Sequence, residues 1–152
     1  MIMIKYCAHC RTPYPDTIGD HCLRLGCEFD VIDIDEGMYA IIDYLTSKNV
    51  RTYYSCSGHA YGFHFSDQYI VIAGDLTDTI DRNPLPKGFE YEIETVRESE
   101  LIDQFGEVGS DTRTIIRASQ HLAKKYPNAM QFQSAINRDL ASLSRWIEKV
   151  FK

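Results

Sequence analysis

Four of the five cysteines fall within the first 27 residues, and their spacing limits what this part of the chain can fold into. The pattern is C-x2-C, eleven intervening residues and C-x4-C, formed by Cys7, Cys10, Cys22 and Cys27. So short a segment cannot bury a sufficient core of its own, and natural modules of this size are held by disulfides or by a metal. Because the first six residues are too short for a signal peptide, we expect reduced thiols that bind a metal.

The two cysteine pairs predict a structural zinc ion in a zinc-ribbon-like module of residues 1–30. Four thiolates close a tetrahedral site at Zn–S distances of about 2.3 Å and leave no open position for a substrate. The dication offsets part of the charge of four thiolates, which makes their burial tolerable. Two alternatives stay open. The C-x2-C pair could be redox-active, or His9 or His21 could replace one cysteine, since the gap between Cys22 and Cys27 is wider than usual.

Length and composition predict a protein without a membrane partner. The chain has 152 residues, of which 44% are hydrophobic, and this is enough for one core. No apolar run approaches the roughly 18 residues of a membrane span, so we expect a soluble, cytoplasmic protein.

The charge is unevenly distributed along the chain. The net charge of −6 argues against a protein that coats nucleic acid. Residues 111–152 carry eight Lys or Arg against three Asp or Glu, and the first 110 residues carry eight against nineteen. The resulting net charges of +5 and −11 permit a local anion site on an acidic protein.

Hydrophobic periodicity predicts an α+β ligand-binding domain over residues 31–152, with a mostly antiparallel sheet packed by helices. Asp35 is expected to cap a helix that runs to about Lys48, and Asn49 to end it in the left-handed conformation. Asn128 is expected to cap a long C-terminal amphipathic helix, whose stripe includes Trp146 as a core residue. The remaining predictions are strands at 51–55, 69–73, 89–94 and 112–117, loops at 12–16 and 56–68, a helical turn at 76–81 and a helix at 118–126.

The segment Ser55-Cys56-Ser57-Gly58-His59 is the candidate ligand loop. Gly58 can take a positive φ at little cost, and successive amides in such a turn can form a nest for an anion. The hydroxyls of Ser55 and Ser57 and the imidazole of His59 add hydrogen-bonding groups.

The surroundings of this loop favour a nucleotide-like or other phosphorylated ligand. Tyr54 and its aromatic neighbours are suited to stacking on a base, and RNA is a conceivable partner. Arg113 and Arg117 share one face of a predicted strand and are candidates to complete the anion site. The alternatives are a tight turn whose serines cap their own backbone, and arginines that pair with Glu92 or Glu94.

Two more specific functions of the same loop have less support from the sequence. Cys56 could act as a nucleophile with His59 or His64 as its base, but a phosphatase-type loop needs an arginine at position 62, which is Gly62. A second metal site from His59, His64 and Asp67 is a further alternative.

The Ser-Cys-Ser-Gly motif of residues 55–58 resembles that of the tRNA wybutosine-synthesising protein family, whose members carry Ser-Cys-Ser-Gly-Arg. The resemblance covers roughly residues 35–73, and His59 stands where that family has arginine. It implies an α+β domain with a nucleotide-type cleft and S-adenosylmethionine-dependent methylation of a modified guanosine. The layout also resembles small uncharacterised bacterial and phage proteins that join a cysteine knuckle to a Ser-Cys-Ser-Gly-His domain. That second resemblance implies a fold and not an activity.

Three functions remain as hypotheses. The first is a zinc-containing binding protein that sequesters a nucleotide-like ligand, as in a phage; the second is an RNA- or nucleotide-modifying enzyme. The third is an adaptor whose zinc module contacts a protein or a nucleic acid. We favour the binding protein, because neither Gly-x-Gly-x-x-Gly nor Gly-Lys-Ser/Thr occurs in the sequence.

Overall fold

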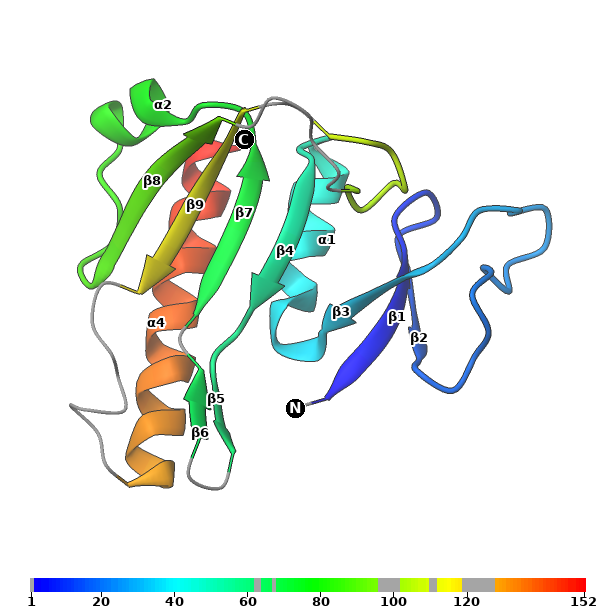
Figure 1. Ribbon diagram of the computed structural model, residues 1–152, viewed down its shortest axis with the longest axis horizontal. Coiled ribbons are helices and arrows are strands. Elements are labelled where there is room, and N and C mark those ends of the chain that lie inside the picture. The colour runs from blue at the N-terminus through cyan, green and yellow to red at the C-terminus, as the bar shows by residue number, and fades with distance from the viewer. Residues whose placement is uncertain (1, 62–63, 67, 96–101, 110–111, 119–127) are drawn as a thin grey trace.

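The computed structural model describes residues 2–61, 64–66, 68–95, 102–109, 112–118 and 128–152, without the side chains of 59–61, 64–66 and 129. It confirms the α+β class. A three-stranded sheet, a four-stranded sheet and a short hairpin are all antiparallel, and helices pack behind the larger sheet (Figure 1). No helix in these ranges combines the length and the apolar character that a membrane span requires.

The N-terminal sheet contains β1 (Met3–Cys7), β2 (Thr12–Pro15) and β3 (Ile32–Asp35) in the order β2-β1-β3. The sequence predicts β2 as an irregular segment because of its two prolines, and this prediction is wrong. An edge strand tolerates proline because one row of its amides has no partner in the sheet. Since β1 also pairs with β3, the sheet crosses the boundary predicted at residue 30.

The larger sheet has the order β4-β7-β9-β8. Its strands are β4 (Thr52–Cys56), β7 (Tyr69–Ala73), β8 (Phe89–Thr95) and β9 (Thr112–Ala118). All four agree with the predicted strands to within one residue at each end. In β9 the side chains alternate: Ile116 is fully buried, whereas Arg113 and Arg117 are partly exposed.

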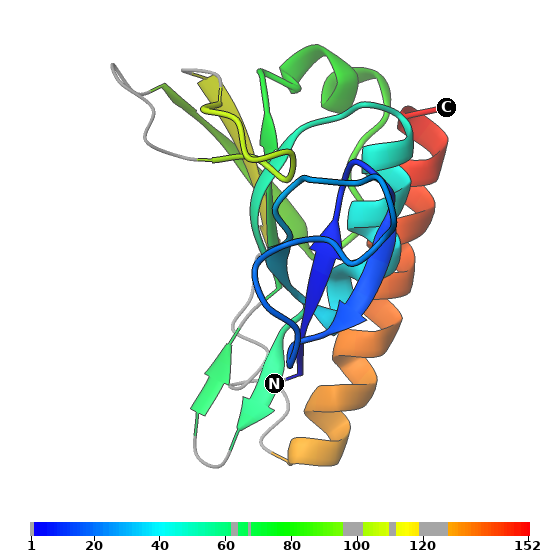
Figure 2. The same cartoon turned by 90° about the vertical axis from the view of Figure 1, so that its right-hand side faces the viewer.

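Two helices cover one face of this sheet (Figure 2). α1 (Tyr39–Ser47) follows a 3-10 turn at Glu36–Met38 that Asp35 caps, and Asn49 ends it with a φ of 56°. α4 (Ala129–Val150) begins at Asn128, whose side chain accepts hydrogen bonds from the amides of Met130 and Gln131. The predicted cap of α4 and the predicted end of α1 are therefore confirmed, whereas Asp35 caps the 3-10 turn and α1 itself begins after Met38, which makes no side-chain capping hydrogen bond. The short α2 (Thr77–Arg82) lies close to the predicted helical turn.

The cysteine module shares its core with the rest of the protein. Tyr6 and Ala8 of the module are buried in the same cluster as Met38, Leu45 and Ile147. As predicted, Trp146 belongs to this core, and its indole N–H donates to the carbonyl of Asn83 at 2.8 Å.

The segment 56–68 forms a hairpin of β5 (His59–Tyr61) and β6 (His64–Ser66), so its prediction as a loop is wrong. This hairpin lies beside the N-terminal part of α4 (Figure 1). The predicted helix at 118–126 begins at Ala118, which ends β9, and its other residues lie outside the described ranges.

Candidate functional site

The structure brings the sulfur atoms of Cys7, Cys10, Cys22 and Cys27 together, all within 4.8 Å of one another. Cys7 Sγ lies 3.7 Å from Cys27 Sγ, and Cys22 Sγ lies 3.9 Å from Cys10 Sγ. In a tetrahedron with metal–sulfur distances of about 2.3 Å, neighbouring sulfurs are about 3.8 Å apart. These two sulfur–sulfur distances match the spacing that a tetrahedral metal ion requires, and the cluster of four could hold one.

Two loops position the four sulfurs. Cys7 ends β1 and Cys10 lies in the tight turn before β2, where Arg11 has a φ of 54°. The second pair lies in the loop before β3, which is closed by hydrogen bonds from the amide of Cys22 to the carbonyl of Phe29 and from the amide of Cys27 to that of Arg24.

The hydrogen-bonding environment distinguishes Cys22 from Cys10. Burial opposes ionisation of Cys22, but hydrogen bonds from the hydroxyl of Tyr14 and the amide of Arg24 outweigh it and lower the pKa of Cys22 to about 7. A hydrogen bond with Cys27, together with burial, raises the pKa of Cys10 to about 12. The Tyr14 hydroxyl and the Arg24 amide thus provide hydrogen bonds that stabilise a thiolate at Cys22.

The two histidines proposed as alternative ligands are engaged elsewhere. The ring of His9 stacks on Phe29 with centroids 3.5 Å apart, and its Nε2 lies 3.3 Å from the carbonyl oxygen of Phe105. His21 Nδ1 lies 2.7 Å from Asp30 Oδ1. Within the described residues, the four cysteines form the group of His, Cys, Asp and Glu side chains close enough to share a metal.

A shared carboxylate attaches the module to α1. Asp43 accepts a hydrogen bond from the hydroxyl of Tyr6 at 2.7 Å and two from Arg11, at 3.0 and 2.9 Å. The hydrogen bonds from Arg11 are the main reason that the pKa of Asp43 lies below its usual range. The turn that carries the first cysteine pair is therefore fastened directly to the helix behind the sheet.

Tyr14 is a residue of the candidate metal centre that the cysteine spacing does not reveal. Its hydroxyl lies 3.2 Å from Cys22 Sγ, and toward a thiolate it can only donate. Replacing such an outer partner typically costs about 10- to 100-fold in metal affinity. We expect Tyr14→Phe to bind zinc about tenfold more weakly in a competition titration with a chromophoric chelator.

A matched control for that experiment is Tyr44→Phe. The hydroxyl of Tyr44 donates to the carbonyl of Phe151, far along the chain from the cysteines, so zinc affinity should not change. Equal affinities of the two variants would show that the Tyr14 hydroxyl does not support the site.

The second candidate site, the loop of residues 55–59, uses two of its donors inside the protein. The amide and the hydroxyl of Ser57 both donate to Asp35 Oδ2, at 2.7 and 2.8 Å. The other carboxylate oxygen of Asp35 accepts from the amide of Gly37 at 2.9 Å. The predicted anion nest at Ser57 is thus filled by a buried carboxylate of the chain itself, with an exposed fraction of 4%.

Gly58 has a packing role in this arrangement. Its φ is 86°, as expected, but a Cβ at this position would lie 2.9 Å from the side chain of Gln68 and 3.1 Å from Ile136 of α4. The glycine therefore lets the end of β4 approach the long helix closely, and it is buried.

The two candidate arginines are paired within the sheet. Arg113 donates to Glu94 at 3.2 and 2.8 Å, and Arg117 forms an ion pair with Glu92. These partners are the ones that the alternative interpretation named, so the positive charge is compensated inside the sheet. The side chains of His59 and His64 and the whole of Asp67 and Gly62 lie outside what the structure describes.

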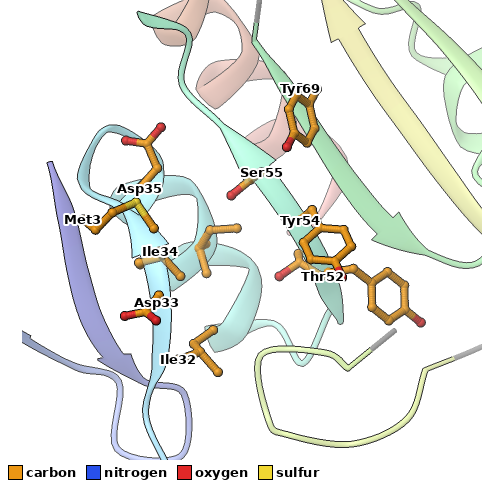
Figure 3. A pocket seen from close by; sticks show the side chains of 11 residues that line it. Met3, Ile32, Asp33, Ile34, Asp35, Thr52, Tyr54, Ser55 and Tyr69 are labelled. Atoms are coloured by element: carbon orange, nitrogen blue, oxygen red, sulfur yellow. The ribbon is translucent and has the colours of Figure 1, made fainter. Parts of the chain in front are cut away.

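Tyr54 and Ser55 line a pocket of about 150 Å³ between β3 and β4 (Figure 3). Ile34 and Ile42 contribute apolar surface to it, and Tyr69 of β7 stands at its upper end in the figure. Burial, and then the nearby groups of Cys56, Tyr54 and Asp35, raise the pKa of Tyr69, which keeps this phenol neutral.

No protein-family model matches the sequence, and no curated protein and no solved structure is significantly similar to it.

Proposed function

We propose that this chain is a small zinc-binding protein and that its zinc ion is structural. The observation that supports this most directly is the set of sulfur–sulfur distances, 3.7 and 3.9 Å, at a site made of four cysteines. Four thiolates in a tetrahedral arrangement are typical of structural zinc, although iron also accepts such a set.

A structural role is supported by how little else holds the cysteine loops. Among the described residues, the hydrophobic cluster at this end has Cys7, Cys22 and Val31 as its buried members, with Cys10, Tyr14, Ile18 and Cys27 packed against them and partly buried. Leu23 and Leu25 between the two later cysteines are exposed by 66% and 103% and contribute no core. The metal would therefore stabilise a loop that apolar burial does not, and a closed four-sulfur shell leaves no position for a substrate.

The test is metal analysis of the purified protein. We expect one zinc per chain and, after exchange for cobalt(II), the absorption bands of tetrahedral cobalt bound by thiolates. Chelation should lower the midpoint of thermal unfolding, because a ligand that binds only the folded state stabilises it. Four thiols that react rapidly in the protein as isolated, without bound metal, would contradict the proposal. Iron with charge-transfer bands of its own would contradict the choice of zinc.

The finer functions stay predictions. A nucleotide-like ligand, RNA as a partner, RNA or nucleotide modification, an adaptor role and a role in a phage each need support beyond the cysteine cluster. For a phosphorylated ligand, the pairing of Ser57 with Asp35 and of Arg113 with Glu94 is unfavourable, since these donors already have acceptors.

A further inference from the structure

The two residues that flank the first cysteine pair are held by one carboxylate of α1. Tyr6 directly precedes Cys7, and on the other side of the pair Arg11 directly follows Cys10. The hydroxyl of Tyr6 donates to Asp43 Oδ1 at 2.7 Å. Arg11 donates through Nε to Oδ1 at 3.0 Å and through a terminal nitrogen to Oδ2 at 2.9 Å. Asp43 therefore fixes the chain on both sides of the Cys-x2-Cys segment.

The contact between Arg11 and Asp43 restricts geometry as well as balancing charge. Two N–H groups of the guanidinium meet the two oxygens of the carboxylate, and this paired arrangement limits how both side chains rotate. Tyr6 is fully buried, and the side chain of Asp43 is exposed by 21%. Because water has limited access to this carboxylate, its contacts hold the turn more firmly than an exposed ion pair does.

The turn that carries the first cysteine pair needs support from outside. Arg11 has a φ of 54°, in the left-handed region that residues with a Cβ rarely adopt. Such a conformation persists only where the surrounding structure holds it. Within the turn, the hydroxyl of Thr12 donates to the carbonyl of Cys10 at 3.2 Å. The contacts with Asp43 attach the same turn to a separate element.

That element, α1, is held in place by packing and not by the cysteines. Ile42 and Leu45, on either side of Asp43 in the sequence, are 2% and 0% exposed and belong to the main core. A group on a packed helix is placed more precisely than a group on a loop. The helix can therefore hold the first cysteine pair in position before a metal binds, so that the ion has to order mainly the second pair.

From this arrangement we infer that Asp43 is a positioning residue of the metal centre, which presets the first cysteine pair and thereby raises the affinity for zinc. The inference rests on the proposed function as a structural zinc protein. Presetting raises affinity because ligands that are already ordered lose less conformational freedom on binding. By reciprocity, bound zinc should in turn stabilise α1 through the same contacts.

Titration of zinc in competition with a chromophoric chelator tests the inference on Asp43→Asn. Asparagine has the same shape and can still accept from Tyr6, but it offers Arg11 one oxygen in place of two and carries no charge. We expect zinc to bind about three- to tenfold more weakly. Arg11→Gln should weaken binding by the same factor, and the double variant no further, because both changes remove one shared contact.

The matched control is Glu94→Gln. It removes the same kind of paired contact, from Arg113 to a carboxylate, at β8 and β9, which lie across the larger sheet from the N-terminal sheet (Figure 1). Its zinc affinity should equal that of the unchanged protein. Thermal midpoints of the zinc-free proteins are compared, since an effect through general stability would also appear in this control. Because the Arg11 side chain is 49% exposed, its variant should remain folded even if Asp43→Asn does not.

Amide hydrogen exchange supplies a second measurement, which a purely structural contact would not affect. Removal of zinc from the unchanged protein should increase exchange in α1 more than in β8, and this difference should be smaller in Asp43→Asn. The inference is overturned if Asp43→Asn and Arg11→Gln bind zinc as the unchanged protein does, if their losses add, or if α1 responds to zinc equally in both proteins. Failure of the unchanged protein to bind zinc would overturn the proposed function, and this inference with it.

Discussion

Replacement of Cys10 by serine is expected to abolish stoichiometric zinc binding and to produce one of the two largest losses of stability among the changes considered. The three remaining thiolates cannot close a tetrahedral shell, and the loop that carries Cys22 and Cys27 has almost no apolar core to replace it. Loss of a ligand present at about 1,000 times its Kd removes about 4 kcal/mol from the free energy of unfolding. Metal analysis and urea unfolding of the same preparation measure both effects.

Cys56→Ser is the matched control for this experiment. Cys56 is the fifth cysteine, lies in β4 outside the cluster, and undergoes the same exchange of sulfur for oxygen. It should keep one zinc per chain. If Cys10→Ser also keeps one zinc with unchanged affinity, Cys10 is not a ligand and the four-cysteine assignment fails.

The second large effect is expected for Asp35→Ala. The carboxylate accepts from the amides of Gly37 and Ser57 and from the hydroxyl of Ser57, so its removal leaves three donors without this acceptor, of which the two of Ser57 are buried. Each buried donor left unsatisfied costs about 1–3 kcal/mol, and we expect a loss of about 3–5 kcal/mol in the free energy of unfolding. Urea unfolding followed by circular dichroism measures this loss.

Ser57→Ala separates the structural role of the loop from a ligand-binding role. It removes one donor and leaves the backbone hydrogen bond to Asp35, so we expect a loss of only about 1 kcal/mol. In the double variant the two losses should not add, because both residues belong to one hydrogen-bonded group. If the free energy of unfolding of Asp35→Ala lies within about 1 kcal/mol of that of the unchanged protein, the donors of Ser57 do not depend on Asp35 for their hydrogen bonds.

Most of the secondary structure follows from local signals. Asp35 and Asn128 cap helices through amides two or three residues away, and Asn49 ends a helix through its own backbone conformation. Such contacts are encoded within one turn of the chain. The predicted strands at 51–55, 69–73, 89–94 and 112–117 are confirmed because alternating or continuous apolar runs identify a sheet locally.

The errors come from partners that are distant along the chain. β2 contains two prolines, and its strand geometry depends on pairing with β1 across the cysteine turn. The polar and glycine residues of segment 56–68 are typical of a loop, but β5 and β6 within this segment pair as a hairpin. In both places pairing across a turn overrides weak local preference, as is common for strands.

The sequence by itself predicted the four-cysteine cluster, which could hold a metal ion, and the α+β class, because cysteine spacing, helix caps and strand alternation are properties of neighbouring residues. Only the tertiary structure decided how the Ser57 loop is used. Asp35 lies 22 residues before Ser57 in the sequence. No short-range pattern predicts that its carboxylate accepts the hydrogen bonds from the donors that an anion would need. The pocket lined by acidic residues and tyrosines depends on tertiary structure in the same way. It forms because β3 lies opposite β4, and the packing of a shared core determines how the two sheets meet.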